Sequence, residues 1–412
     1  MPELASPVLA LREALAHPLG QPALALKARG KDDALIILAD HTRNYSYQLW
    51  LSELIDQLNR AGLPDERISL YVASGTHRPM TPEEREARFG AGLCRRLKFL
   101  EHDAGNEERM EKVGRTDYGT TLYVDRRVYQ SDFLIITGGI QYHYFAGYSG
   151  GRKAILPGVS GRSTILHNHS LAFDRRTGAF GETVKPGVVF NNPVSEDMHE
   201  ACMLIRPDFC VNVVLNAEKQ IGWIGAGDYG YVHRVGAAFL DSYNRLALDR
   251  QFDVVVVGAG GYPKDISLFQ AHKSLRHAYA AARPGAHIVW LAGCEEGEGP
   301  PAMKEFRPLD IDGARRKLVQ QFDMGALCSF SLKLLAREFT IHMVTRLDHA
   351  LVREWGLIPH ATLDEALSAL PARADKLSWA VGPDMSNVLA EQRAAGEPAA
   401  EPVAAGTKEA KP

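Results

Sequence analysis

The chain has 412 residues, of which 45% are hydrophobic and 24% are charged, and its formal net charge is −3. This composition is typical of a soluble globular protein, and the length favours two domains. The weak net charge argues against a nucleic-acid partner, and because no apolar run reaches the ~18–20 residues that cross a bilayer, we expect no membrane partner either.

The N-terminus and the cysteines indicate the compartment. The first twenty residues contain Glu3 and no leading cationic segment, so we expect no signal peptide. The five cysteines show no CxxC pairing, which is typical of reduced thiols. We therefore expect a cytoplasmic protein, either alone or as a homo-oligomer.

Polar residues follow two apolar segments that are predicted to be buried strands. The segment 33–40 ends in Asp40-His41-Thr42-Arg43, and the segment 68–73 runs into a loop that contains His77. Helical patterns follow each strand, over 47–63 and from Thr81 onward. This alternation predicts an α/β fold, in which ligands bind at the carboxyl ends of the strands.

A glycine-rich stretch over 138–169 follows a third apolar segment at 133–137. It contains seven glycines together with three histidines and two cations: His143, Arg152, Lys153, His167 and His169. Glycine lets backbone approach a ligand closely, and Gly150, Gly151, Arg152 and Lys153 offer N–H groups and charges to a phosphate. The spacing is not that of a P-loop. The alternative is a flexible basic surface loop with unrelated histidines.

The rest of the chain indicates a second unit. A helix is expected from about 191 and a strand over 209–215, and the strongly apolar strand 252–258 opens a strand–helix–strand pattern with a second strand at 287–292. We predict an N-terminal α/β domain over 1–247, a Rossmann-like α/β domain over 248–390 and a disordered tail over 391–412, with the active site in the cleft between the domains. The glycine spacing after 258 is weak evidence for a dinucleotide. Helices over 313–339 and 362–370 and a strand over 341–345 complete the second domain.

Three histidines, His77, His143 and His169, lie at or near the ends of strands. Two on opposite sides of a substrate would serve as acid and base, and the third would serve as a metal ligand. His167 and His169 would face the same way only on extended chain, so one of them should point elsewhere. A zinc site needs three or four ligands, and no acidic or cysteine ligand follows at a regular spacing.

A carboxylate-binding group is predicted on the helix that follows residue 265. Gln270 and Lys273, at i and i+3, share a helix face, and an amide with an ammonium suits a carboxylate. A solvated helix face is the alternative, and Arg43 has the same ambiguity.

Taken together, these residues resemble the lactate racemase family, which uses a nickel-pincer nucleotide. The resemblance covers roughly residues 33–385, and it is strongest in four segments: HYFAGYSGGRKAILPG (143–158), NNPVSEDMHEA (191–201), NVVLN (212–216) and GAGGYPKDISLFQAHKSL (258–275). It implies an isomerase, a racemase or epimerase of a 2-hydroxy acid, with nickel held in a pyridinium-3,5-bisthiocarboxylic acid mononucleotide.

The resemblance also implies roles for single residues. Lys153 would carry the cofactor covalently, and His169 would complete a square-planar site whose geometry and soft donors suit nickel. His77 and His143 would be the acid/base pair for reversible hydride transfer from C2. The substrate carboxylate would contact Arg43, Gln270 and Lys273, with Asp40 nearby. The family also implies cofactor biosynthesis proteins as partners for loading.

Two departures from the family pattern bear on the substrate. Phe269 stands where a tyrosine is expected, so a hydroxyl contact is lost, and Asn44-Tyr45-Ser46 replaces a proline-rich turn. A larger or more apolar 2-hydroxy acid is therefore as compatible as lactate. Two alternatives of other classes are a hydrolase or lyase with histidine-bound zinc, and a non-catalytic member that binds an anion or nucleotide.

Overall fold

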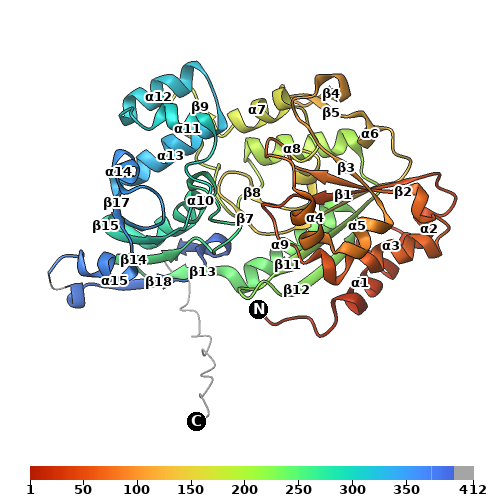
Figure 1. Cartoon of the computed structure of the whole chain (residues 1–412), viewed down its shortest axis with the longest axis horizontal. Coiled ribbons are helices and arrows are strands. Elements are labelled where there is room, and N and C mark those ends of the chain that lie inside the picture. The colour runs from red at the N-terminus through yellow and green to blue at the C-terminus, as the bar shows by residue number, and fades with distance from the viewer. Residues whose placement is uncertain (373, 394–412) are drawn as a thin grey trace, which may run out of the picture.

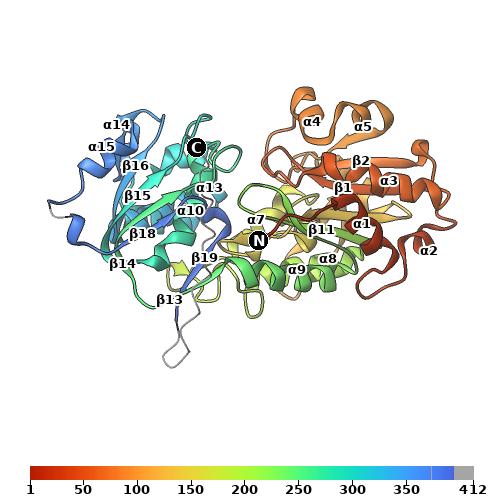
Figure 2. The same ribbon diagram turned by 90° about the horizontal axis from the view of Figure 1, so that it is seen from below.

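The computed structural model describes residues 1–372 and 374–393, which form two α/β domains that lie side by side (Figure 1). The first domain contains a six-stranded sheet and the second a five-stranded sheet. Seen from below, the domains form two lobes, and helix α9 (Tyr229–Asn244) runs along the base of the first lobe toward the second (Figure 2). The predicted two-domain α/β architecture is confirmed.

The first sheet is parallel except at one edge, where β11 and β12 are antiparallel. Its strands, in spatial order, are β12 (Ile221–Gly227), β11 (Phe209–Leu215), β6 (Leu134–Gly139), β1 (Ala34–Ala39), β2 (Ile68–Ala73) and β3 (Lys98–Glu101). Ala34 of β1 pairs with Ile68 of β2, and Leu35 pairs with Leu134 of β6. The carboxyl ends of these three strands therefore meet at one edge of the sheet.

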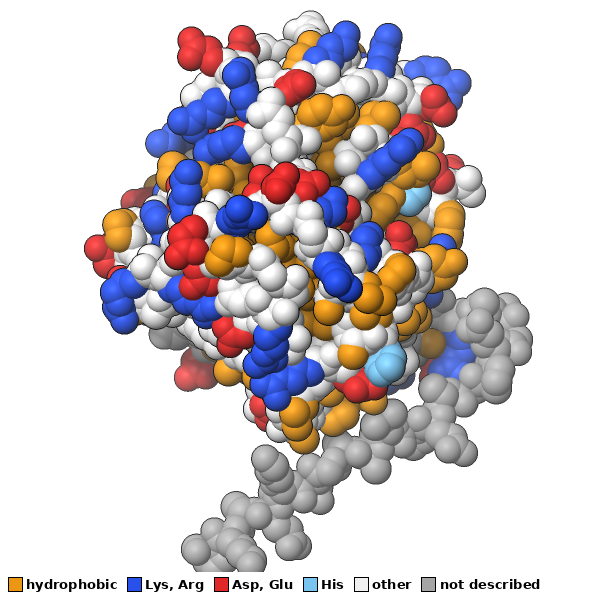
Figure 3. All heavy atoms as spheres, turned by 90° about the vertical axis from the view of Figure 1, so that its right-hand side faces the viewer, with side chains coloured by type: hydrophobic (Ala, Val, Ile, Leu, Met, Phe, Trp, Pro, Cys, Tyr) orange, Lys and Arg blue, Asp and Glu red, His pale blue; other side chains and the backbone are white. Residues whose placement is uncertain are grey.

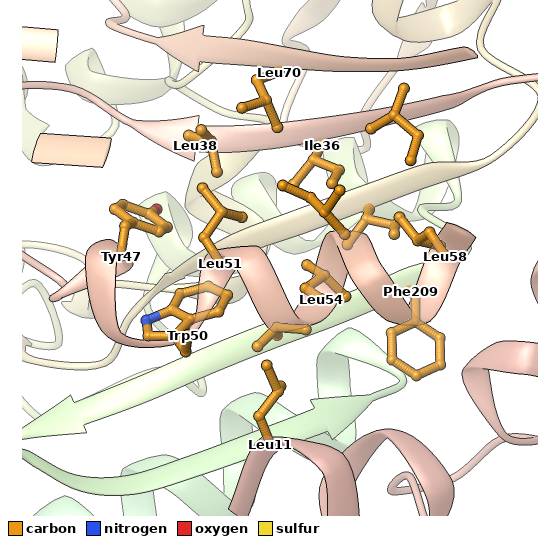
Figure 4. Packing of buried hydrophobic residues seen from close by; sticks show 14 of the residues in the cluster. Leu11, Ile36, Leu38, Tyr47, Trp50, Leu51, Leu54, Leu58, Leu70 and Phe209 are labelled. Atoms are coloured by element: carbon orange, nitrogen blue, oxygen red, sulfur yellow. The ribbon is translucent and has the colours of Figure 1, made fainter. Parts of the chain in front are cut away.

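Helices α1 (Pro7–Ala16), α2 (Leu24–Ala28) and α3 (Leu51–Arg60) cover one face of this sheet. Figure 4 shows α3 lying against the strands, with side chains from helix and sheet interleaved: Leu11, Ile36, Leu38, Tyr47, Trp50, Leu51, Leu54, Leu58, Leu70 and Phe209. Each buried leucine contributes roughly 1.5–3 kcal/mol. This layer therefore holds β1, and the polar loop at its end, firmly in place.

The other face packs against α7 (Arg162–Ser170) and α8 (Pro193–Ile205), and also against helices of the second domain. Helices α11 (Pro301–Phe306), α12 (Ile311–Gln320) and α13 (Met324–Glu338) contribute to the same apolar cluster. The ring of Phe330 lies 5.6 Å from that of Phe173. The single helix expected over 313–339 is two helices, because the side chain of Asp323 accepts N–H bonds and begins α13.

The second sheet is parallel throughout. Its order is β17 (Ile358–His360), β16 (Thr340–Val344), β15 (Ala282–Leu291), β14 (Phe252–Gly258) and β18 (Trp379–Gly382). Helices α10 (Leu268–Ala278) and α13 pack on one face, while α15 (Leu363–Ser368) packs on the other and α14 (His349–Glu354) precedes β17. The description of this domain as Rossmann-like stays a prediction.

The domains are joined where α9 leads into β13 (Arg245–Leu248), which pairs in parallel with β19 (Leu389–Gln392). The predicted boundary at 247/248 falls inside β13. Glu391 and Gln392, which we assigned to the tail, are the last residues of β19, so the start of the tail was placed too early. Residues 394–412 of the predicted tail lie outside the described residues.

Smaller elements complete the first domain. The segment over 101–127, which shows no clear pattern, contains the hairpin of β4 (Met110–Arg115) and β5 (Thr121–Asp125). The others are α4 (Pro82–Phe89), α5 (Ala91–Arg96), α6 (Arg126–Tyr129), β7 (Tyr142–His143), β8 (Gly147–Tyr148), β9 (Phe173–Asp174) and β10 (Ala179–Phe180). On the outer face of this domain, acidic and basic side chains are interspersed (Figure 3). This mixing agrees with the weak net charge.

Candidate active site

A cavity lies between the two domains, at the carboxyl ends of β1, β2 and β6. The loops after these strands, the glycine-rich segment and α10 of the second domain form its walls, which enclose about 980 Å³ of empty space, including some open to solvent. Nine of the predicted site residues line it: Asp40, Arg43, His77, His143, Gly150, Lys153, His169, Phe269 and Lys273. Gln270 lies beside it, with its Nε2 3.4 Å from Nε2 of His77.

Lys153 lies in a 3-10 turn (Gly151–Ala154) whose entry requires glycine. Gly150 and Gly151 have φ values of 78° and 49°, and a Cβ on Gly150 would lie 2.4 Å from Oδ1 of Asn212. The amine of Lys153 lies 5.7 Å from the ring centroid of Phe145. Burial, together with nearby cations, lowers the pKa of Lys153 well below its ordinary value. The lowered pKa makes the neutral, nucleophilic form of this amine easier to reach than that of an exposed lysine.

Arg152 differs from our expectation. Its guanidinium is buried and donates to Oγ of Ser195 at 2.8 Å and to the carbonyl of Ala146 at 3.1 Å, and it also contacts the ring of His233. It does not line the cavity. Arg152 therefore supports the glycine-rich loop from within the protein.

His169 is buried near the end of α7 and presents one ring nitrogen to the cavity. Its Nδ1 donates to the carbonyl of Ile165 at 2.9 Å, which leaves Nε2 with its lone pair. Burial and the charge of Lys153 lower the pKa of His169 to about 3. A neutral imidazole fixed by a backbone carbonyl is a suitable metal ligand. His167 instead contacts the carbonyl of Tyr118 and does not line the cavity, as expected for one of the two.

His77 forms a dyad with Asp40. Its Nδ1 lies 2.6 Å from Oδ2 of Asp40, while the hydroxyl and N–H of Thr42 donate to Oδ1. Burial alone would raise the pKa of Asp40, but the charge and hydrogen bond of His77 outweigh it and lower that pKa below its usual range. When the ring of His77 is neutral, Nδ1 carries the proton shared with Asp40 and Nε2 is the acceptor, 3.4 Å from Nε2 of Gln270.

His143 has the opposite arrangement of its ring nitrogens. Its Nδ1 accepts a hydrogen bond from the N–H of Ala146 at 3.3 Å, so Nε2 carries the hydrogen of the neutral ring. Burial and the charges of Lys153 and Lys273 lower the pKa of His143 well below its ordinary value. One histidine is therefore poised to accept a hydrogen bond and the other to donate one.

Positively charged side chains converge on the cavity, and little negative charge is present to neutralise them. Arg43 donates to the carbonyl of Thr42, and Lys273 donates to Oε1 of Gln270. Burial and the charge of Arg43 lower the pKa of Lys273 to about 7. Asp40 is the one acidic side chain among the described residues that line the cavity. The arrangement favours an anion, and a carboxylate bound between Arg43 and Lys273 would supply the missing charge.

Three contributions were missed from the sequence. Thr42 fixes Asp40, Asn212 accepts the N–H of Gly151 at 2.9 Å, and Met324 of the second domain lines the cavity. Asn212 could have been noticed, because it is the single amide in the buried strand over 209–215. No sequence signal indicated Met324, which is brought to the cavity by the packing of α13.

The described part of the chain contains neither a cluster of metal ligands nor a membrane-spanning helix. No group of three or more His, Cys, Asp or Glu side chains is placed to hold a metal ion, so the zinc alternative finds no ligand set there. Among residues 1–372 and 374–393, every helix is too short or too polar to span a membrane.

Comparison with known proteins gives consistent matches along the chain. Residues 1–180 match the lactate racemase N-terminal domain and residues 248–388 the lactate racemase C-terminal domain. Lactate racemase from Lactiplantibacillus plantarum is 31% identical over 374 residues, which is 88% of this chain and 86% of that protein. Lactate racemase from Thermoanaerobacterium thermosaccharolyticum is 31% identical over 366 residues, covering 87% and 84%.

Solved structures also match this chain. The lactate racemase apoprotein from T. thermosaccharolyticum superposes with a TM-score of 0.86 at 28% identity, covering 95% of this chain and 94% of that one. A Thermotoga maritima protein shares the fold with a TM-score of 0.72 at 18% identity, covering 95% and 100%. The matched domains, the relatives and the shared fold agree with the residues gathered at the cavity, and the chain belongs to the lactate racemase family of isomerases.

Proposed function

We propose that this protein inverts the configuration at C2 of a 2-hydroxy acid, either lactate or a larger one, with a nickel-pincer nucleotide attached to Lys153. One observation carries the proposal. A buried lysine with a lowered pKa, a histidine with a free ring nitrogen and two further histidines face one cation-rich cavity. The relatives named lactate racemase support the same reaction class.

The residues present fit the cofactor. Lys153 has no acidic partner among the described residues and a lowered pKa, as an amine that forms an amide-type bond requires. His169 offers Nε2 as a ligand. When bound, the nickel nucleotide supplies a hydride acceptor and donor for C2.

The chain's own residues orient the substrate. Arg43 and Lys273 lie on the wall formed by both domains and suit the carboxylate, with Gln270 positioned between Lys273 and His77. Phe269 offers no hydroxyl and lies beneath the ammonium of Lys273, 5.8 Å from it. This apolar ring favours a substrate whose C3 group is apolar.

The two histidines move the hydroxyl proton. His77, backed by Asp40, accepts the proton at Nε2 from a substrate bound with one configuration. His143 serves the opposite configuration from the other side of the substrate, as the base once its ring takes the tautomer that leaves Nε2 free and gives up the hydrogen bond from Ala146. Two groups are needed because one imidazole cannot reach the hydroxyl of both enantiomers bound by the same carboxylate contacts.

Intact-mass measurement tests the attachment. Protein produced together with the cofactor biosynthesis proteins should carry an added mass that Lys153→Arg lacks, because arginine keeps the charge but cannot form the bond. Racemisation of single-enantiomer 2-hydroxy acids should be lost in the same variant. Equal added mass on Lys153→Arg would refute the attachment, and zinc without added mass on an active wild type would favour the hydrolase or lyase.

The proposal also includes how the nucleotide cofactor reaches the protein and in which compartment the protein works. We infer that dedicated biosynthesis proteins supply the nucleotide and that both they and this protein work in the cytoplasm. The cysteines of the described chain, Cys94, Cys202, Cys210, Cys294 and Cys328, are free thiols, which supports a reducing compartment.

A further inference from the structure

A second cavity adjoins the site cavity on the other side of its cationic wall. It encloses about 870 Å³ of empty space, including open solvent, and shares Arg43, His143 and Lys273 with the site cavity. The turn between β11 and β12 and the loop after β14 form its outer part. The cations proposed to hold the substrate therefore face two spaces.

Among the described residues, the second cavity is lined by cations and by no acidic side chain. Lys219 and Lys264 add to Arg43 and Lys273, and the described lining includes neither Asp nor Glu. Lys264 is paired with Asp384 at 2.9 Å outside the lining, whereas Lys219 is exposed and donates to the carbonyl of Tyr262 at 3.2 Å. Positive charge in a low-dielectric concavity attracts anions.

Five amides also line the second cavity, beside hydroxyl groups and histidines, and the side-chain oxygen of one amide is unpaired among the described residues. Asn44, Gln141, Asn216, Gln270 and Asn387 all contribute. The side chain of Asn387 is buried and its Oδ1 has no hydrogen-bond partner among the described residues, although its Nδ2 donates to the carbonyl of Leu215. A buried acceptor left unpaired favours a ligand with a hydrogen to donate.

An anion that also carries a hydroxyl group meets both requirements. We propose that the second cavity is an entry site that binds a hydroxycarboxylate before it reaches the site cavity. The ligand is of the same class as the substrate in the proposed function, on which this inference rests. Lys219 at the exposed mouth captures the carboxylate, and the shared pair Arg43 and Lys273 receives it on the inner side.

The first test measures binding directly, without turnover. Cofactor-free protein labelled with ¹⁵N-lysine is titrated with L-lactate and, separately, with propionate, which lacks the hydroxyl. The amide signals of Lys219 and Lys264 should shift along one saturation curve and that of Lys153 along another. Lys219→Gln should remove the first curve and leave the second, and propionate should bind the first site several-fold more weakly.

The second test uses the loaded enzyme. Lys219→Gln should lower kcat/KM about fivefold at low ionic strength with kcat unchanged, and Lys219→Arg should restore it, because steering depends on charge. Lys98→Gln, which removes an exposed charge on β3, is the matched control and should change neither constant. An unchanged kcat/KM in Lys219→Gln overturns the entry site.

The outcomes separate this inference from the proposed function. Signals of Lys219 and Lys264 that stay fixed while Lys153 saturates refute a second site even if the enzyme racemises lactate. Saturation of the same signals by nicotinic acid mononucleotide, but not by lactate, would assign the cavity to the ribose and phosphate of the cofactor and refute the entry site. Loss of all turnover in the loaded wild type would refute the proposed function and leave the binding result standing.

Discussion

Replacing Lys273 by methionine should stabilise the cofactor-free protein at low pH while damaging the active site. Burial and the charge of Arg43 lower the pKa of Lys273 from 10.5 to about 7. The unfolded chain therefore binds more protons at this residue between pH 7 and 10.5, so the lysine's contribution to stability rises with pH across that range. Below pH 7 the folded protein must hold the ammonium in its charged, poorly solvated state.

The size of this change in stability follows from the difference between the pKa values of Lys273 in the unfolded and folded chain. At 1.36 kcal/mol per pH unit, the wild type should gain about 3 kcal/mol more than Lys273→Met between pH 6 and pH 9.5. The free energy of unfolding, obtained from urea titrations at both values, measures this gain. Lys98→Met, at an exposed position on β3, should follow the wild type. If the free energy of unfolding changes equally between pH 6 and pH 9.5 in the wild type and in Lys273→Met, the lowered pKa assigned to the buried Lys273 is refuted.

The same variant tests the carboxylate site. With cofactor bound, Lys273→Met should lower kcat/KM by roughly 10–100-fold, because a charge-assisted hydrogen bond to the substrate is lost. Nickel content should stay at the wild-type level. Nickel loss would instead identify Lys273 as a residue that holds the cofactor.

Two further predictions concern the histidines. His169→Ala should lose nickel and activity, measured by elemental analysis and chiral separation, whereas His167→Ala should keep both, since His167 does not line the cavity; equal metal loss in two folded variants contradicts the assignment. In a single turnover quenched within milliseconds, His77→Ala should form the 2-keto acid slowly from one enantiomer and His143→Ala slowly from the other, each by ~10²–10⁴-fold. If the same variant is slow with both enantiomers, one histidine is the sole base.

The amino-acid sequence determined the parts of this protein that depend on neighbouring residues. Apolar runs over 33–40 and 252–258 are β1 and β14, because buried parallel strands require continuous apolar residues. The helix expected from Thr81 onward is α4, which Thr81 caps through a capping box with Glu84. The glycine run before Lys153 adopts positive φ, which glycine tolerates best.

The tertiary structure decided which of these residues meet. The direction of Arg152, buried against Ser195, depends on a helix some forty residues further along the chain. Glu391 joins a strand only because β13 lies beside it, and Asp40 fixes the tautomer of His77, which lies thirty-seven positions further along the chain. Such contacts depend on how sheets and helices pack, and local periodicity carries no information about partners so distant in the chain.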